Sequence, residues 1–328
     1  MKIKGARTAC SFCQWYPLFS KNAVEAVILS LPDDVLKYVE HDAFLLPVEA
    51  ASNVNLAKDS EWSDGSAICN DEVDEDVTVQ PTFPDFSKQI QEVIDDFGAV
   101  FIKTNWSTPS DAAWMLSTKT LKCCSLEDVY LLLKGSDRIS RDLSFVSSCD
   151  DQTENLLKPC LILKKWRDID PCSEFRCFVI NQELVGICQR DTSQYYKHIE
   201  TEKYDIQRDI KSLFTEKIKN NFSLRDYTFD VIRIKKDKVK ILDFGLLDKS
   251  ATERTLFTLE ELHSDIREKP EFRFIAEDMG IQPTKYSGHV CVPQEINEFF
   301  QSMGGMSVIE ALRKEVEEQE KEGDSDDE

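Results

Sequence analysis

Two stretches of this chain have the pattern of β-hairpins in which charged side chains alternate with apolar ones. The first, KKWRDIDPCSEFRCFVINQELVGICQRD, runs from Lys164 to Asp191 and carries many basic charges. The second, FDVIRIKKDKVKILDFG, runs from Phe229 to Gly245 and carries the acids Asp230 and Asp243. Charges embedded in apolar strands are disfavoured unless opposite charges neutralise them. Basic groups that face paired carboxylates suit a polyphosphate with magnesium, so the two hairpins predict a cleft of that kind.

The charges of the first hairpin fall at positions that can share one face of a sheet. A leading strand, PCLILKKW, ends in Lys164, Lys165 and Trp166. Two further strands follow and are expected to pair through a turn at Asn181 and Gln182. Arg176 alternates with apolar neighbours, so it and Arg190 are expected to point into one cleft. An ordinary amphipathic sheet with a solvated face is the alternative.

Composition limits the classes of partner. The 328 residues, 41% of them hydrophobic, are enough for two lobes with real cores. A net charge of −21 argues against nucleic acid or an anionic membrane as the main partner. No apolar run reaches the roughly 20 residues that span a bilayer, and the first residues lack the apolar core of a signal peptide. A cytoplasmic protein with reduced cysteines is therefore expected. We also expect a monomer.

The pattern along the chain predicts an N-terminal lobe over residues 1–135, a C-terminal lobe over 136–310 and an acidic tail over 311–328. An acidic, flexible insert is expected at about residues 50–80, where apolar density falls. Before it, residues 24–32 are predicted as a strand, 32–42 as a helix and 43–49 as another strand. The aromatic segment WYPLF at residues 15–19 is expected to pack on the core rather than on a partner.

Lys103 is a candidate phosphate ligand. A helix with apolar residues at helical spacing ends at Gly98, and the strand AVFIKTN follows with Lys103 near its end. A lysine between a strand and a turn-rich loop is well placed for a phosphate, whereas a surface lysine with a buried stem is the competing interpretation. The helix after this loop is predicted to begin at Ser125 with a capping box to Asp128.

Two motifs imitate sites of other kinds. Lys103, SRDL at residues 140–143 and DFG at 243–245 imitate protein-kinase motifs, but a glycine-rich loop and the catalytic asparagine are missing. Cys10 and Cys13 form a CxxC, and Cys123 and Cys124 are adjacent, yet the four histidines lack zinc-site spacing. Neither a kinase nor a zinc site is expected.

Several motifs, taken together, resemble those of the cell division cycle protein 123 family. They are WYPLF, EWSDG, FIKTNWS, LKKW, EFRCFV, QRD, YYKHI, FDV, LDF, FTLEEL and EFRF, which cover nearly the whole chain. The resemblance implies an α+β, ATP-grasp-like fold with two α/β lobes that hold ATP and Mg²⁺ in the cleft between them. It implies an assembly chaperone that binds the gamma subunit of eukaryotic translation initiation factor 2 and promotes assembly of the heterotrimer. Such a protein supports translation initiation and cell-cycle progression.

The resemblance also implies roles for individual residues. Asp230 and Asp243 would hold Mg²⁺, with Asp230 also at the nucleotide. Lys103 would contact phosphate, and Trp106 would lie near the nucleotide. Lys164, Lys165 and Trp166 would form the edge that meets adenine. Arg176 and Arg190 would neutralise the phosphates, with Gln189 beside them.

Gly245 departs from the family pattern, which has an asparagine ligand to the metal in Asp-Phe-Asn-Pro, whereas this chain has DFGLLDKS. We expect ATP binding to survive this change and its dependence on metal to be altered, because water and phosphate supply several magnesium ligands. An ATP-grasp ligase or kinase acting on a carboxylate or protein substrate is the alternative function. The missing ligand argues against it and against turnover catalysis.

Overall fold

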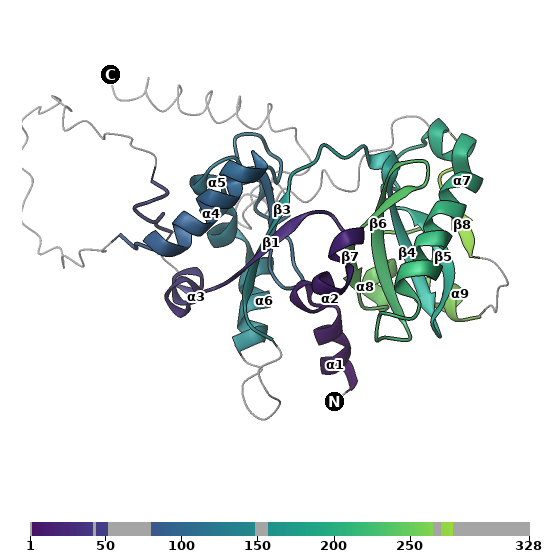
Figure 1. Ribbon diagram of the computed structural model, residues 1–328, viewed down its shortest axis with the longest axis horizontal. Helices are drawn as coiled ribbons and strands as arrows, with labels where there is room; N and C mark the ends of the chain where they lie inside the picture. Colours follow the sequence, from purple (N-terminus) through teal and green to yellow (C-terminus); the bar gives the residue numbers. More distant parts are fainter. Residues whose placement is uncertain (1, 42–43, 52–79, 148–156, 265–269, 278–328) are drawn as a thin grey trace, which may run out of the picture. The chain divides into compact units, whose positions relative to one another are not determined.

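The computed structural model describes residues 2–41, 44–51, 80–147, 157–264 and 270–277 (Figure 1). The described residues all belong to one compact unit. The acidic insert and the acidic tail expected from the sequence lie outside the described residues.

A three-stranded antiparallel sheet contains β1 (Ala26–Ser30), β3 (Cys160–Lys165) and β2 (Val100–Lys103), in that spatial order. Alternate residues of β3 serve two hydrophobic cores: Leu161 and Leu163 belong to one, Cys160 and Ile162 to the other. The helices α3 (Asp33–Glu40), α4 (Pro84–Phe97), α5 (Leu126–Gly135) and α6 (Asp137–Ser147) supply residues to the core of Leu161. The central strand of this sheet is therefore buried on both faces.

A five-stranded sheet has the order β7-β6-β4-β5-β8, and all but its β5–β8 pair are antiparallel. Its strands are β4 (Glu174–Ile180), β5 (Glu183–Gln189), β6 (Tyr227–Lys235), β7 (Lys238–Gly245) and β8 (Glu271–Arg273). Asn181 and Gln182 join β4 to β5 with φ angles of 52° and 63°. Two residues with positive φ are the signature of a tight hairpin turn that matches strand twist. Both predicted hairpins are confirmed.

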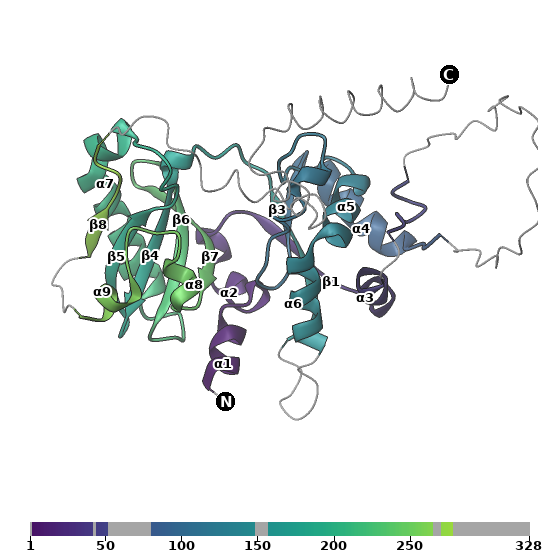
Figure 2. The ribbon, with the colours of Figure 1, turned by 180° about the vertical axis from the view of Figure 1, so that it is seen from behind.

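Helix α7 (Lys197–Leu213), with the π-helical segment Phe214–Ile218, covers one face of this sheet, as Figures 1 and 2 show from opposite sides. Its apolar stripe, which includes Ile206, Ile210 and Leu213, is buried in a core shared with β4, β5, β6 and β7. On the opposite face a smaller core joins Phe178 to Phe257 and Leu262. The short helices α8 (Lys249–Thr252) and α9 (Leu259–Ser264) lie in the segment that supplies this core.

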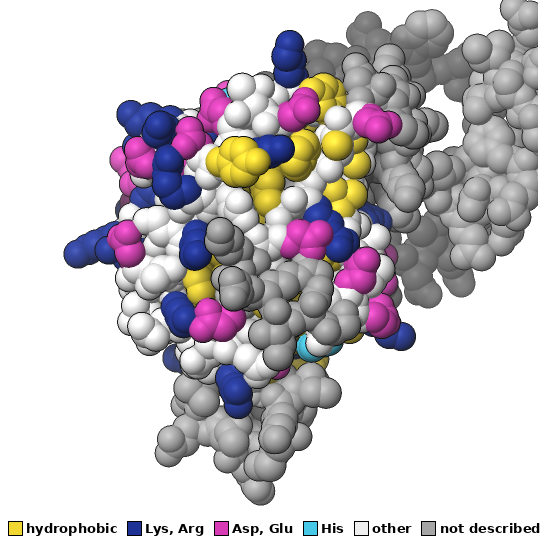
Figure 3. Space-filling model, turned by 90° about the vertical axis from the view of Figure 1, so that its right-hand side faces the viewer, with side chains coloured by type: hydrophobic (Ala, Val, Ile, Leu, Met, Phe, Trp, Pro, Cys, Tyr) yellow, Lys and Arg dark blue, Asp and Glu magenta, His cyan; other side chains and the backbone are white. Residues whose placement is uncertain are grey.

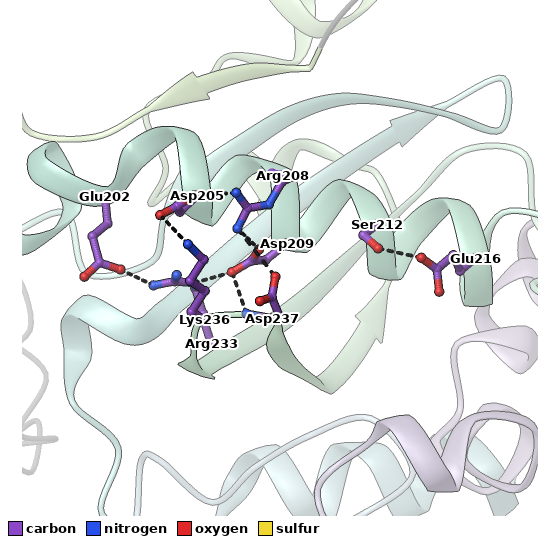
Figure 4. A network of polar contacts seen from close by, with 9 residues as sticks. All are labelled: Glu202, Asp205, Arg208, Asp209, Ser212, Glu216, Arg233, Lys236 and Asp237. Atoms are coloured by element: carbon purple, nitrogen blue, oxygen red, sulfur yellow. Dashed lines mark hydrogen bonds and ion pairs between the residues drawn. The ribbon is translucent and has the colours of Figure 1, made fainter.

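A network of charged side chains ties α7 to the β6–β7 hairpin (Figure 4). Arg233, on β6, is 6% exposed and donates hydrogen bonds to Asp209 (2.8 Å) and Glu202 (2.5 Å), both on α7. Asp209 also accepts a hydrogen bond from the backbone N–H of Asp237 in the hairpin turn. Burial of such charges is tolerated because each is hydrogen-bonded to an opposite charge.

The N-terminal helices α1 (Lys2–Ala9) and α2 (Phe12–Phe19) precede the first sheet. Phe12, Trp15 and Phe19 of α2 are buried, and the Trp15 ring lies 5.1 Å from that of Phe244 on β7. The expectation that WYPLF packs on the core is confirmed. Short 3-10 segments occur at Ser20–Asn22, Ala113–Met115 and Pro171–Ser173.

Local predictions mostly agree with the structure. Gly98 has φ +76° after α4, and Ser125 and Asp128 form the capping box of α5. SRDL lies inside helix α6, which confirms that it is no kinase catalytic loop. The strand predicted at residues 43–49 is wrong, because residues 44–51 contain no strand and turn at Pro47. Proline lacks the N–H that a central strand donates.

The two sheets divide the chain after β3, so the first sheet includes a strand that follows the boundary expected at residue 135. The lobe boundaries themselves stay predictions. Among the described residues, no helix is long and apolar enough to cross a membrane. Figure 3 shows that basic and acidic side chains are interspersed on the described surface of one face, around a small group of hydrophobic ones.

Candidate functional site

A pocket of 570 Å³ lies where the end of β3 meets β4, β6 and β7. Its volume is in the usual range for a small-molecule site. It combines apolar walls with a concentration of charge. Its lining residues are Val24, Phe101, Thr108, Leu121, Lys164, Lys165, Trp166, Arg167, Asp168, Ile169, Glu174, Phe175, Arg190, Asp230, Leu242 and Asp243. Six of the ten residues predicted from the sequence are among them: Lys164, Lys165, Trp166, Arg190, Asp230 and Asp243.

The register of the larger sheet places three predicted residues in one row across neighbouring strands. Arg176 on β4 lies opposite Asp230 on β6, and Asp230 lies opposite Asp243 on β7. Residues opposite one another on one face of a sheet are close enough for their side chains to interact. The two carboxylates therefore come together although 12 residues separate them in the chain.

Arg176 forms a bidentate pair with Asp230. Its Nε and Nη2 donate hydrogen bonds of 2.8 and 2.7 Å to the two carboxylate oxygens, and Nη1 donates to the Ala251 carbonyl at 3.1 Å. Arg190 adds a second cation, with its Nε 3.9 Å from Asp230. Burial opposes ionisation of Asp230, but attraction to Arg176 and the hydrogen bonds from it outweigh burial and lower its pKa. Asp230 is held as a carboxylate.

Lys103 is fully buried at the end of β2, and its ammonium forms an ion pair with Asp243. The Nζ atom also lies 5.4 Å from the centre of the Phe12 ring on α2. A surface lysine, the competing interpretation of this residue, is therefore wrong. Lys103 does not line the pocket, but its carboxylate partner does.

Lys164 lies beside this ion pair with only 8% of its surface exposed. Its ammonium donates a hydrogen bond of 2.6 Å to the Leu242 carbonyl and lies 4.9 Å from the centre of the Phe12 ring. Burial lowers the pKa of Lys164 to about 7, although Asp243 acts in the opposite direction. A lysine in this state gains its charge readily when an anion arrives.

The chain after β3 forms one edge of the pocket. The backbone N–H of Trp166 donates to the Ala99 carbonyl at 2.9 Å, and its indole N–H donates to Asp168 at 3.0 Å. Lys165 lies 3.8 Å from the Glu25 carboxylate and 5.1 Å from the centre of the Phe97 ring. These contacts fix the edge that the family resemblance assigns to adenine.

Gln189 and Trp106, two of the predicted residues, are not part of the pocket lining. Gln189 is fully buried; its amide nitrogen donates to the carbonyls of Asp191 and Gln194, and its oxygen accepts a hydrogen bond from Ile275. The indole N–H of Trp106 donates to the Arg7 carbonyl at 2.8 Å. Their assignment as nucleotide ligands stays a prediction.

Sequence reasoning missed Glu174 and the apolar wall that includes Phe101, Phe175 and Leu242. Burial, followed by repulsion from Asp230, raises the pKa of Glu174. Its alternation with Arg176 along one strand was the available signal. The apolar wall had no such signal, because its members come from three separate strands.

A metal at this site would rely on few protein ligands. Among the described residues, no group of three or more histidine, cysteine or acidic side chains is arranged to hold a metal ion. Asp230 and Asp243 alone still fit magnesium, which commonly takes one or two carboxylates together with substrate phosphates and water. At Gly245, a Cβ atom would lie 2.8 Å from the Thr228 hydroxyl, so a larger residue would require Thr228 to move.

Comparison with known proteins identifies the relatives of this chain. The family model D123 matches residues 15–300. A Xenopus laevis "translation initiation factor eIF2 assembly protein" is 35% identical over 300 residues, which are 84% of this chain and 86% of that protein. A "cell division cycle protein 123" from Yarrowia lipolytica is 37% identical over 239 residues, covering 72% of this chain and 62% of that protein.

A solved structure has the same fold. Cdc123 from Schizosaccharomyces pombe matches with a TM-score of 0.66 at 30% sequence identity, covering 84% of this chain and 98% of that one. The α+β fold class and the family resemblance predicted from the sequence are both confirmed. The chain belongs to the D123 family.

Proposed function

We propose that this protein binds ATP with Mg²⁺ in the pocket between β3 and the larger sheet and serves as an assembly chaperone for eukaryotic translation initiation factor 2. In this proposal it acts in the cytoplasm as a monomer and binds the gamma subunit, to which the alpha and beta subunits then join. The names of its relatives support the partner, since several are described as eIF2 assembly proteins. Support of translation initiation and cell-cycle progression would follow from this role.

The observation that carries the nucleotide part is the concentration of opposite charges around the pocket. Lys103, Lys164, Arg176 and Arg190 lie around the two carboxylates of Asp230 and Asp243. Such a set of basic side chains, in which Lys164 gains its charge as the anion binds, is matched to a polyphosphate, and the carboxylates are matched to the metal that accompanies it. The apolar wall of Phe101, Phe175 and Leu242 suits a purine ring.

The ion pairs hold these groups in place for the ligand. Asp230 orients Arg176 through two hydrogen bonds, and Asp243 orients the buried Lys103. Preorganised charges need little rearrangement to meet a phosphate, which favours affinity. Mg²⁺, when bound by Asp230 and Asp243, would screen these carboxylates from the phosphates.

A binding role fits this arrangement better than turnover. With Gly245 in the place of a family ligand, the chain offers two carboxylates to the metal. ATP at about 1,000 times its dissociation constant would stabilise the protein by roughly 4 kcal/mol, which suffices to order a surface that a partner recognises.

Capture of the purified gamma subunit by the immobilised protein, with and without ATP and magnesium, tests the proposal. The expected result is retention of the gamma subunit that increases with ATP, together with no sustained release of ADP. Arg190→Gln should reduce the increase in retention that ATP causes, whereas Arg138→Gln on the exposed surface of α6 should not. Absence of retention by folded protein, or many turnovers of ATP per protein, would contradict the chaperone role.

A further inference from the structure

A short loop after β2, residues 104–108, connects the candidate phosphate ligand to the pocket wall. Lys103 precedes the loop and pairs with Asp243, and Thr108 at its end lines the pocket. The loop closes on itself through a hydrogen bond of 2.9 Å from the Thr104 N–H to the Ser107 carbonyl. Its conformation therefore affects the placement of both Lys103 and Thr108.

One carboxylate holds this loop from behind. Asp142, on α6, is 3% exposed, and its Oδ2 atom accepts three hydrogen bonds from the loop. The donors are the Thr104 hydroxyl at 2.8 Å, the Trp106 N–H at 3.2 Å and the Ser107 N–H at 2.6 Å. Hydrogen bonds to a buried carboxylate are stronger than those between neutral groups, so this contact fixes the loop firmly.

A second layer holds Asp142 and Trp106 together. Arg7, on α1, has its Nη2 atom 3.4 Å from the other oxygen of Asp142. The guanidinium carbon of Arg7 lies 4.6 Å from the centre of the Trp106 ring and 3.9 Å from that of Phe145, one turn beyond Asp142. The Arg7 carbonyl accepts the indole hydrogen bond of Trp106. Helices α1 and α6 thus hold the loop between them.

The direction of the loop's N–H groups has a chemical consequence. Consecutive N–H groups in a turn form a concave surface that binds anions, and many phosphate sites use it. Here the N–H groups of Trp106 and Ser107 point to Asp142 instead. A phosphate in the pocket must then be recognised by side chains, which the position of this loop helps to place.

We propose that Asp142 is a positioning residue for the nucleotide site: its carboxylate fixes loop 104–108, which keeps Thr108 in the pocket wall and Lys103 beside Asp243, where the two residues serve the phosphates of the ligand. Arg7 supports this function by holding Asp142 and Trp106. The inference rests on the proposed binding of ATP and extends it to two residues that lie outside the pocket lining. Asp142 is the aspartate of the SRDL segment that imitates a kinase motif, so in this proposal that aspartate positions a loop.

The test compares two ligands that differ only in phosphate. Dissociation constants for ATP with magnesium and for adenosine are measured by calorimetry for the full chain, for Asp142→Ala and Asp142→Asn, and for the control Asp137→Asn at the exposed start of α6. We expect Asp142→Ala to weaken ATP binding by about tenfold or more and to leave adenosine within about twofold. Asp142→Asn keeps an acceptor oxygen and should lose less affinity for ATP than Asp142→Ala. Asp137→Asn should bind ATP with the same affinity as the unchanged protein.

An equal loss of affinity for ATP and for adenosine in Asp142→Ala would overturn the inference, because it would indicate that Asp142 has a general structural role. Unchanged ATP affinity in Asp142→Ala would overturn it as well. If the unchanged protein itself does not bind ATP, the proposed function fails, and this inference fails with it.

A second variant covers the case in which Asp142→Ala does not fold. Arg7→Ala removes a partly exposed side chain and should weaken ATP binding by about threefold, again without weakening adenosine binding. It should also increase hydrogen exchange at the N–H groups of Trp106 and Ser107. Unchanged exchange and unchanged ATP affinity in Arg7→Ala would show that the loop does not depend on this layer and would contradict the proposal.

Discussion

Arg176 and Asp230 lie opposite each other on β4 and β6 and share two parallel hydrogen bonds of 2.8 and 2.7 Å. Their side chains are 17% and 19% exposed, so water stabilises these charges little and each is stabilised largely by the opposite charge. The same pair belongs to the row of charges that lies at the pocket. Its contributions to folding and to binding are separable by mutation.

Removal of one partner should destabilise the protein more than removal of both. Arg176→Met takes away both hydrogen bonds to Asp230 and leaves it with more distant cations such as Arg190, so we expect a loss of about 2–4 kcal/mol in the free energy of unfolding. The double variant Arg176→Met/Asp230→Leu should recover most of that loss and yet fail to bind ATP. Urea unfolding of the single and double variants measures the coupling. Additive losses would contradict a mutual dependence of the two charges.

The low pKa of Lys164, about 7, predicts uptake of a proton when ATP binds. Above pH 7 the free protein holds a largely neutral lysine, whereas a phosphate nearby favours the ammonium form. Calorimetry of ATP binding in buffers with different ionisation enthalpies should detect close to one proton taken up at about pH 8.5, and Lys164→Met should abolish this uptake. An identical binding enthalpy in all buffers would contradict the assignment.

The same shift predicts a pH dependence of stability. An unfolded lysine has a pKa of about 10.4, so between pH 7 and about 10 the unfolded chain binds more protons at this position than the folded protein. Burial of the Lys164 charge therefore lowers the free energy of unfolding by its full amount below pH 7. This loss becomes smaller as the pH rises. The stability of the unchanged protein relative to Lys164→Met should increase over this range, as urea unfolding at several pH values would measure. A difference that stays constant would indicate that Lys164 is charged throughout.

The network between α7 and the β6–β7 hairpin should make the protein sensitive to acid (Figure 4). Burial opposes ionisation of Asp209, but hydrogen bonds from Arg233, the Asp237 N–H and Arg208 outweigh burial and lower its pKa. This contribution is present above the unfolded pKa of about 3.9 and is lost as the pH falls through the lower, folded value.

Asp209→Asn should reduce the free energy of unfolding by about 3 kcal/mol near pH 7, because Arg233 would lose a buried charged partner. The difference from the unchanged protein should shrink below about pH 4. Asp237→Asn is the matched control, since this aspartate is 73% exposed and its positive φ suits asparagine. Equal effects of the two substitutions would show that burial of the pair contributes little.

Gly245 predicts a weak dependence of ATP binding on metal. Gly245→Asn alone should destabilise the fold by about 1–3 kcal/mol, because its Cβ would meet the Thr228 hydroxyl. Thr228→Ala should relieve that contact, and Gly245→Asn/Thr228→Ala should show a stronger effect of magnesium on ATP affinity than the unchanged protein. ATP titrations with and without magnesium provide the comparison. An unchanged magnesium effect in the double variant would contradict a ligand role for position 245.

The sequence contained enough information for the strands that build the site but not for all of its contacts. Alternation of charged and apolar residues identified Arg176, Asp230 and Asp243, because side chains alternate between faces along a strand. The same logic could not reveal that Gln189 bonds to Ile275 or that Asp142 bonds to the loop of Trp106. Those contacts join residues 86 and 36 positions apart and depend on how the elements pack.

Calorimetric titration with ATP and magnesium tests the central claim most directly, with Arg190→Gln and Arg138→Gln beside the unchanged protein. Arg190 lies at the pocket 3.9 Å from Asp230, and Arg138 lies exposed on α6. We predict saturable binding at one site, weakened by about tenfold or more in Arg190→Gln and unchanged in Arg138→Gln. Absence of binding, or equal affinity in all three proteins, would contradict a nucleotide site in this pocket.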